Sequence, residues 1–109
     1  MCVNFKSRHF SNYTIFRLEN LCIFGHNQKL QNVAKLRSKN INYINDTLLP
    51  IIVMITESAN GNSYIYVDAQ LIMKTITADN DVTLTFIVPP NSSYKMTGSS
   101  NFSCWIEYR

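Results

Sequence analysis

Residues that could act as nucleophiles or metal ligands are few in this chain of 109 residues, and they are widely spaced. The three cysteines are Cys2, Cys22 and Cys104, and no two of them have the short spacing of a zinc site. His9 and His26 have no acidic or thiol partner at ligand spacing. We therefore expect three reduced thiols, no metal site and no cofactor.

The acidic residues do not form a catalytic arrangement either. Asp79 and Asp81 stand in a polar stretch, where aspartate usually bonds to the local backbone, and a calcium loop would need more oxygen ligands. Glu107 has no partner base near it in the sequence. Motifs of serine hydrolases, zinc proteases, P-loops and dinucleotide-binding turns do not occur. We expect no catalytic residue and no enzyme activity.

Tyrosine and asparagine near residue 60 offer binding chemistry of another kind. Tyr64 follows Asn60 and Asn62, and Tyr66 shares the face of Tyr64 on an alternating segment. Such side chains form neutral surfaces that contact sugars or proteins through aromatic rings and hydrogen bonds. We take Asn60, Asn62 and Tyr64 as candidate contact residues, with an ordinary half-exposed strand face as the alternative.

Short strands must position these residues, because the composition favours β-structure. The chain has twelve Ile and eight Thr, which suit strands, beside thirteen Asn and ten Ser, which suit turns. Seven segments have strand character and are separated by turn residues: 41–45, 51–56, 63–68, 71–77, 82–88, 93–97 and 102–108. This spacing predicts an all-β domain, a small antiparallel, jelly-roll-like β-sandwich or a barrel.

Several local patterns sharpen that prediction. The apolar run 51–56 predicts a strand buried on both faces, and Asn60-Gly61 predicts a hairpin turn. In 82–88 apolar residues alternate with threonine, and Pro89 and Pro90 end the segment because proline cannot donate to a ladder. Residues 28–37 could form a short helix.

Charge divides the chain into two parts. Residues 1–40 carry seven basic and one acidic residue, whereas residues 41–109 carry three basic and six acidic residues. The basic charges are scattered singly, so we expect a solvated, loosely ordered segment over 1–24, with nucleic-acid binding by residues 1–40 as the alternative. No apolar run is long enough to span a membrane, and the N-terminus does not resemble a secretory signal.

Scattered motifs from residue 25 onward resemble a bacteriophage tail-fibre pattern. The early pattern G-x-x-Q-x-W-x-x-V, R, Y-x-N-x-T and P-I-x-V is similar to Gly25–Val33, Arg37, Tyr43–Thr47 and Pro50–Val53. The late pattern F-I-V-P-x-G-x-x-Y and W-x-E-L-R is similar to Phe86–Tyr94 and Trp105–Arg109. The residues that carry the late motif or its core are Phe86, Val88, Pro89, Tyr94, Trp105, Glu107 and Arg109.

Three positions depart from this pattern. Leu30 stands where the pattern has Trp, and Tyr108 stands where it has Leu. Asn91 stands where Gly is usual, which is a mild change because Asn also tolerates the left-handed backbone conformation.

The resemblance implies a tail-fibre tip over residues 25–109. Such tips are commonly homotrimers in the virion, made in the cytoplasm of the host bacterium, that bind a surface glycan or outer-membrane protein. The resemblance implies neither nucleic-acid binding nor membrane insertion, and it makes Asn60, Asn62 and Tyr64 candidate receptor contacts. A structural virion or assembly protein with the same fold and no receptor role is the alternative.

Overall fold

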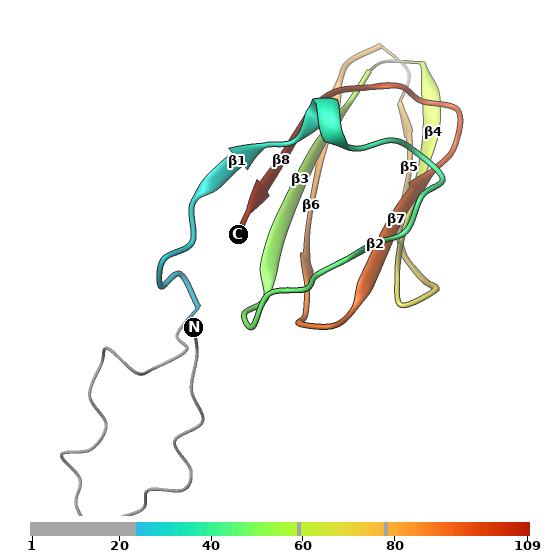
Figure 1. Ribbon diagram of the computed structural model, residues 1–109. Helices are drawn as coiled ribbons and strands as arrows, with labels where there is room; N and C mark the ends of the chain where they lie inside the picture. The colour runs from blue at the N-terminus through green and yellow to red at the C-terminus, as the bar shows by residue number, and fades with distance from the viewer. Residues whose placement is uncertain (1–23, 59, 78) are drawn as a thin grey trace, which may run out of the picture.

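The computed structural model describes residues 24–58, 60–77 and 79–109. The basic segment 1–24 lies outside this part except for Phe24. The described residues form strands and one 3-10 helix, η3 (Ala34–Leu36). The strands are β1 (Leu30–Asn32), β2 (Tyr43–Ile44), β3 (Ile51–Glu57), β4 (Gly61–Val67), β5 (Gln70–Thr77), β6 (Val82–Val88), β7 (Ser93–Thr97) and β8 (Phe102–Tyr108) (Figure 1).

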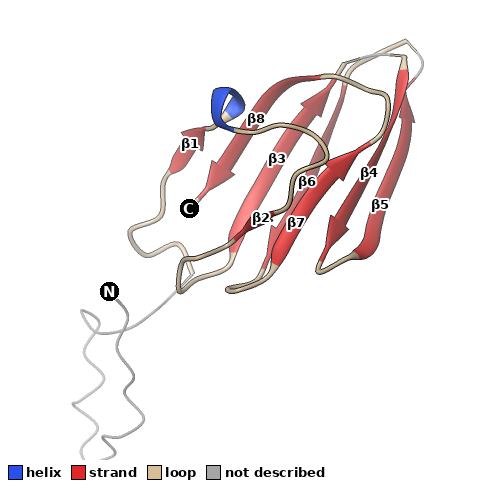
Figure 2. Ribbon diagram, turned by 45° about the vertical axis from the view of Figure 1, so that its right-hand side comes forward, coloured by secondary structure: helices blue, strands red, loops and turns tan. Residues whose placement is uncertain are grey.

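The strands form two antiparallel sheets packed face to face (Figure 2). The first sheet has the order β1-β8-β3-β6, and the second has the order β2-β7-β4-β5. The ladders β1–β8, β2–β7, β3–β6 and β4–β5 are those of one long antiparallel ribbon wound into two layers. This is the jelly-roll arrangement, and the predicted all-β antiparallel sandwich is confirmed.

The helix predicted over 28–37 is wrong. The segment instead contains β1 and the three-residue η3. Backbone groups that a helix would use are bonded elsewhere: the Val33 N–H donates to the Trp105 carbonyl at 2.9 Å, and Asn32 Oδ1 accepts from the Ala34 N–H at 3.1 Å. Pairing with a strand that is distant in sequence therefore overrides the local preference.

The prediction that 51–56 is buried on both faces is also wrong. Ile51, Val53 and Ile55 are fully buried between the sheets, whereas Ile52 and Met54 are only half-buried on the outer face of the first sheet. The apolar run is unbroken because both faces of this strand carry apolar side chains, although only one face points into the core.

The turn at Asn60-Gly61 does not close a hairpin. Asn60 has a positive φ of 66°, as a turn residue, but β3 and β4 on either side of it belong to different sheets. The hairpin of the second sheet lies at Asp68 and Ala69, which both have positive φ and join β4 to β5. Asp68 was expected within the strand but lies in this turn, where its carboxylate accepts hydrogen bonds from Ser92 and Ser93 of the neighbouring segment.

An aromatic cluster lies at the centre of the sandwich. Trp105 and Tyr94 are the largest fully buried side chains, and Phe86 packs edge-on against Tyr94 with ring centroids 5.5 Å apart. The Phe102 ring contacts Trp105 at 4.8 Å. Val88 is also buried, whereas Pro89 is exposed at the end of β6. The late motif therefore contributes much of the core.

Candidate functional site

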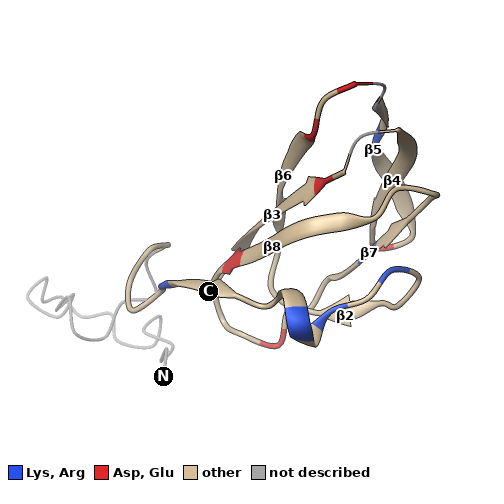
Figure 3. Cartoon of the chain, turned by 90° about the horizontal axis from the view of Figure 1, so that it is seen from above, with Lys and Arg blue, Asp and Glu red and all other residues tan. Residues whose placement is uncertain are grey.

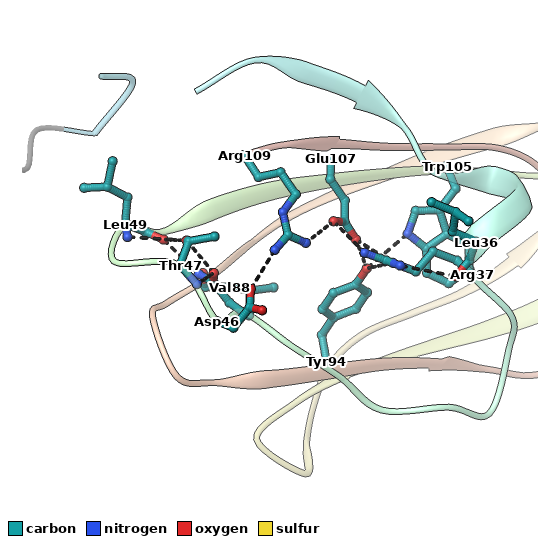
Figure 4. A network of polar contacts seen from close by, with 11 residues as sticks. Leu36, Arg37, Asp46, Thr47, Leu49, Val88, Tyr94, Trp105, Glu107 and Arg109 are labelled. Atoms are coloured by element: carbon teal, nitrogen blue, oxygen red, sulfur yellow. Dashed lines mark hydrogen bonds and ion pairs between the residues drawn. The ribbon is translucent and has the colours of Figure 1, made fainter. Parts of the chain in front are cut away.

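Glu107 is a fully buried carboxylate at the centre of a polar network between the sheets (Figure 4). The Arg37 guanidinium donates to both of its oxygens, from Nε at 3.0 Å and from Nη2 at 3.1 Å. Arg109 donates from Nη1 at 2.7 Å and reaches Asp46 at 3.0 Å with Nη2. The Tyr94 hydroxyl also donates to Glu107 and accepts from the Trp105 indole N–H at 3.2 Å.

The network changes the pKa values of Glu107, Tyr94 and Arg37. Burial would raise the pKa of Glu107, but the hydrogen bonds from Arg37, Tyr94 and Arg109 outweigh it and lower the pKa. Burial and the adjacent Glu107 carboxylate raise the pKa of Tyr94. Burial opposes the charge of Arg37, yet its bonds to Glu107 and Tyr94 raise its pKa on balance. The carboxylate is thus held ionised, as a fixed structural anion.

Asn45 is the second buried polar centre at this end of the molecule. Its side-chain amide donates to the carbonyls of Leu49 at 2.8 Å and Val88 at 3.0 Å. Its Oδ1 accepts from the N–H and the hydroxyl of Thr47, at 3.0 and 2.6 Å. Asn45 therefore closes the 45–50 turn onto the end of β6, and it shortens the strand predicted over 41–45 to Tyr43–Ile44.

The outer face of the second sheet carries the side chains best suited to a partner. We call the group of outward residues Asn62, Tyr64, Tyr66, Lys74, Lys95 and Thr97 the tyrosine face. The exposed Ile76, which pairs with Asn62, lies beside this group. Tyr64 lies directly between Lys74 and Thr97 in the ladder, and Tyr66 lies beside Lys95. The Lys95 ammonium is 5.5 Å from the centre of the Tyr66 ring. The tyrosine rings of β4 thus lie between hydrogen-bond donors on the neighbouring strands β5 and β7.

The three candidate contact residues lie together at one end of this face. Asn60 is exposed, and Asn62 and Tyr64 are half-exposed on adjacent outward positions of β4. The backbone of Asn62 is held by the 98–101 loop, because its carbonyl accepts from the Ser100 N–H at 3.0 Å and its N–H donates to Ser99 Oγ at 3.0 Å. Gly98 is required there, since a Cβ on it would lie 2.2 Å from the Asn62 carbonyl oxygen.

Sequence reasoning did not single out Lys74 and Lys95. Their positions relative to Tyr64 and Tyr66 depend on the pairing of β4 with β5 and β7, which no local pattern specifies. The available signal was the alternation of β5 and β7, which places Lys74 and Lys95 outward once the buried neighbours are known.

The basic residues of the 1–40 segment that the structure describes have mixed surroundings. Arg37 forms an ion pair with Glu107, and the Lys39 ammonium donates to the carbonyls of Gly98 and Ser100 at 3.0 and 2.8 Å. Lys29 and Lys35 are exposed. Two of these four cations therefore stabilise the fold through internal contacts.

The remaining candidate chemistry is dispersed. Among residues 24–58, 60–77 and 79–109, no group of three or more His, Cys, Asp or Glu comes together. In the same part of the chain, Cys104 is a free thiol and Asp79 and Asp81 are exposed in the turn after β5. The described helical residues include no segment long and apolar enough to cross a membrane. Cys2, Cys22 and His9 lie outside the described residues.

Comparison with known proteins adds nothing to the tail-fibre resemblance, which rests on the sequence motifs alone. No family model, no curated protein and no solved structure matches this chain.

Proposed function

We propose that this chain is the non-enzymatic tip domain of a bacteriophage or prophage tail fibre, which binds a glycan or outer-membrane protein on a bacterial surface. In this proposal it acts as a homotrimer in the virion. The observation that carries the proposal is that the motif residues, dispersed over the sequence, are linked by direct contacts. Such convergence is expected when a scattered pattern specifies one fold rather than arising by chance.

Four contacts illustrate this convergence. Gln28 donates to the Pro50 carbonyl at 2.8 Å, and Val33 donates to the carbonyl of Trp105. Arg37 and Arg109 both bind Glu107. The Val33–Trp105 and Arg37–Glu107 contacts join the early motif to the late motif, and the other two join residues within one motif.

The departures from the pattern also support the resemblance. Leu30 and Tyr108 are direct cross-strand partners, so the expected Trp–Leu pair is replaced by a Leu–Tyr pair that keeps one aromatic and one aliphatic side chain. Asn91 has a φ of 66°, the left-handed conformation that makes Gly usual at this position. Each departure is thus compatible with the backbone of the motif.

The tyrosine face is the proposed receptor-binding surface. Tyrosine supplies rigid contact area at low entropic cost, and Asn and Thr supply adaptable hydrogen bonds, as in antibody paratopes. Lys74 and Lys95 add donors that suit hydroxyl-rich or anionic sugars. Asn60 extends this surface beyond Asn62 and Tyr64 to the end of the sandwich.

A cell-binding assay tests the proposal. The labelled protein is applied to a panel of bacterial strains, and saturable binding to a subset of strains is expected. Tyr64→Ala should weaken that binding by about tenfold or more, because it removes a central aromatic contact. Lys29→Ala, which changes an exposed lysine outside the tyrosine face, serves as the control and should bind as the wild type does.

Two outcomes would contradict the proposal. Absence of binding to every strain would favour the structural or assembly role. Binding that Tyr64→Ala and Tyr66→Ala both leave unchanged would remove the tyrosine face as the receptor-binding surface.

A further inference from the structure

The outer face of the first sheet differs from the rest of the surface because none of its outward positions is charged. The charged residues in the four strands are Glu57 and Glu107, and both are buried between the sheets. β6 has no charged residue along its length (Figure 3). Where this face is polar, Thr56 and Thr83 bond to each other at 2.8 Å across the strands.

Apolar side chains on this face form a row across the whole sheet. Leu30 on β1 pairs with Tyr108 on β8, which pairs with Ile52 on β3, which pairs with Ile87 on β6. Leu30 is 66% exposed and Ile87 is 57% exposed, so the row is open to solvent at both edges of the sheet.

A second row lies beside the first. Ile106 on β8 pairs with Met54 on β3, and both side chains point outward and are half-buried. We call the two rows together the apolar face: Leu30, Ile52, Met54, Ile87, Ile106 and Tyr108. The Phe24 ring adjoins it, edge-on to Tyr108 at 6.1 Å.

We infer that the apolar face is the surface through which copies of this chain associate, and that its occupant is a second copy of the chain. This inference rests on the proposed homotrimer and adds the surface that forms it. When the same face of two copies comes together, any charge on it meets the same charge on the other copy and is repelled. A face without charged side chains avoids this repulsion. The tyrosine face, with Lys74 and Lys95, would repel its own copies.

The size of the face sets how much it can contribute to this contact. β3, β6 and β8 have seven residues each and β1 has three, so strands about 4.8 Å apart with about 3.4 Å per residue give the outer face of the first sheet about 400 Å². Two such faces together cover about 800 Å², and a specific interface buries at least about 1,000 Å², so residues at the edges of the face must add to the contact. In a three-fold arrangement the face of each copy is shared between two neighbours.

Light scattering coupled to size exclusion, at micromolar concentration, tests this inference on the full chain. The wild type should have the mass of a trimer. Ile87→Glu should raise the dissociation constant by about a hundredfold or more and release monomers, because it would bury an unpaired carboxylate. Ile76→Glu is the matched control: Ile76 is an isoleucine 78% exposed on β5 of the second sheet, and its variant should remain a trimer.

Circular dichroism separates dissociation from unfolding, since Ile87→Glu should keep the β-sheet spectrum of the wild type. Leu30→Glu, at the opposite edge of the apolar face, provides an independent second variant with the same expected dissociation. A folded monomer in both variants supports the inference.

Three other outcomes are decisive. A monomeric wild type overturns both the trimer and the apolar face as its interface. A wild-type trimer that both variants leave intact overturns the inference and leaves the proposed trimer standing. A wild-type dimer that Ile87→Glu and Leu30→Glu dissociate supports the apolar face and contradicts the trimer.

Discussion

Glu107 and Glu57 are both fully buried on neighbouring strands of the first sheet, yet their carboxylates have very different partners. Glu107 is bound by two arginines and a tyrosine hydroxyl. Glu57 Oε1 accepts from Thr75 Oγ1 at 2.6 Å, while no described protein group bonds to its Oε2. The hydroxyls of Ser63 and Ser100 are likewise buried without a described protein partner.

The difference shows which part of the sandwich depends on charge. Around Glu107, ion pairs join β8 to the segment after η3 and to the 45–50 turn, so that end of the fold depends on an intact network. Glu57 lies where β3 ends, and the chain continues from there to the Asn60–Asn62 segment. The proposed receptor contacts Asn60 and Asn62 therefore follow closely after Glu57, the glutamate that has fewer described partners than Glu107.

Replacing Glu107 should have the largest effect. Glu107→Gln removes the partner of two arginines in a buried site and should lower the free energy of unfolding by about 3–5 kcal/mol. Urea denaturation followed by Trp105 fluorescence measures this loss. Asp46→Asn is the control, because the Asp46 side chain is 80% exposed and its bond to Arg109 should contribute about 0–1 kcal/mol. Equal losses in the two variants would contradict the comparison.

Acid should act on the same carboxylate. The pKa of Glu107 is lower in the folded state than in the unfolded state, so its contribution to stability is complete above the unfolded value of about 4.3. That contribution is lost as the pH falls from there through the folded pKa. The melting temperature should therefore fall below about pH 4 in the wild type and fall less in Glu107→Gln. Parallel pH profiles for the two proteins would show that Glu107 is not the responsible group.

Base should act through Tyr94, with the opposite sign. Its pKa is raised in the folded state, so its contribution is complete below the unfolded value of about 10 and is lost as the pH rises further. Tyr94→Phe should reduce the fall of the melting temperature in alkaline solution. An unchanged alkaline profile in this variant would assign that fall to another group.

Replacing Asn45 tests the same end of the molecule without changing a charge. Asn45→Ala leaves the buried carbonyl of Val88 without its donor and should cost about 1–3 kcal/mol. The change should appear in the urea midpoint. Asn101→Ala, at an exposed asparagine, should leave that midpoint close to the wild-type value, and a similar shift in both variants would contradict the assigned role of Asn45.

Replacing Glu57 should have the smallest effect. Glu57→Gln keeps an acceptor for Thr75 and removes a charge that no described cation balances. The free energy of unfolding should stay within about 1 kcal/mol of the wild type. A loss as large as that of Glu107→Gln would show that Glu57 has a charged partner and would end the contrast between the two glutamates.

Strand positions could be predicted where the local pattern is complete. The predicted strands 82–88, 93–97 and 102–108 agree with β6, β7 and β8 residue for residue. The alternation of apolar residues in β6 and the end of the strand at proline depend only on neighbouring residues, so both can be predicted from the sequence. Strand β1 was missed because its three residues are held by their ladder to β8 rather than by their own propensity.

The candidate site was only partly predictable. Tyr64 and Tyr66 were placed on one face because they are two residues apart in one strand. The bond between Arg37 and Glu107 spans seventy residues of sequence, and no local pattern predicts such a pair. Lys95 reaches Tyr66 only because β7 pairs with β4 in one register.

The sequence by itself determined that this chain is all-β, where most strands lie, and which of their faces holds Phe86, Val88 and other core residues. These features follow from the period of two in each strand, which is local. The tertiary structure alone decided the division into two sheets, the site of the true hairpin and the partners of each buried glutamate. These features depend on contacts between residues far apart in sequence, where small differences in packing and hydrogen bonding select one pairing over another.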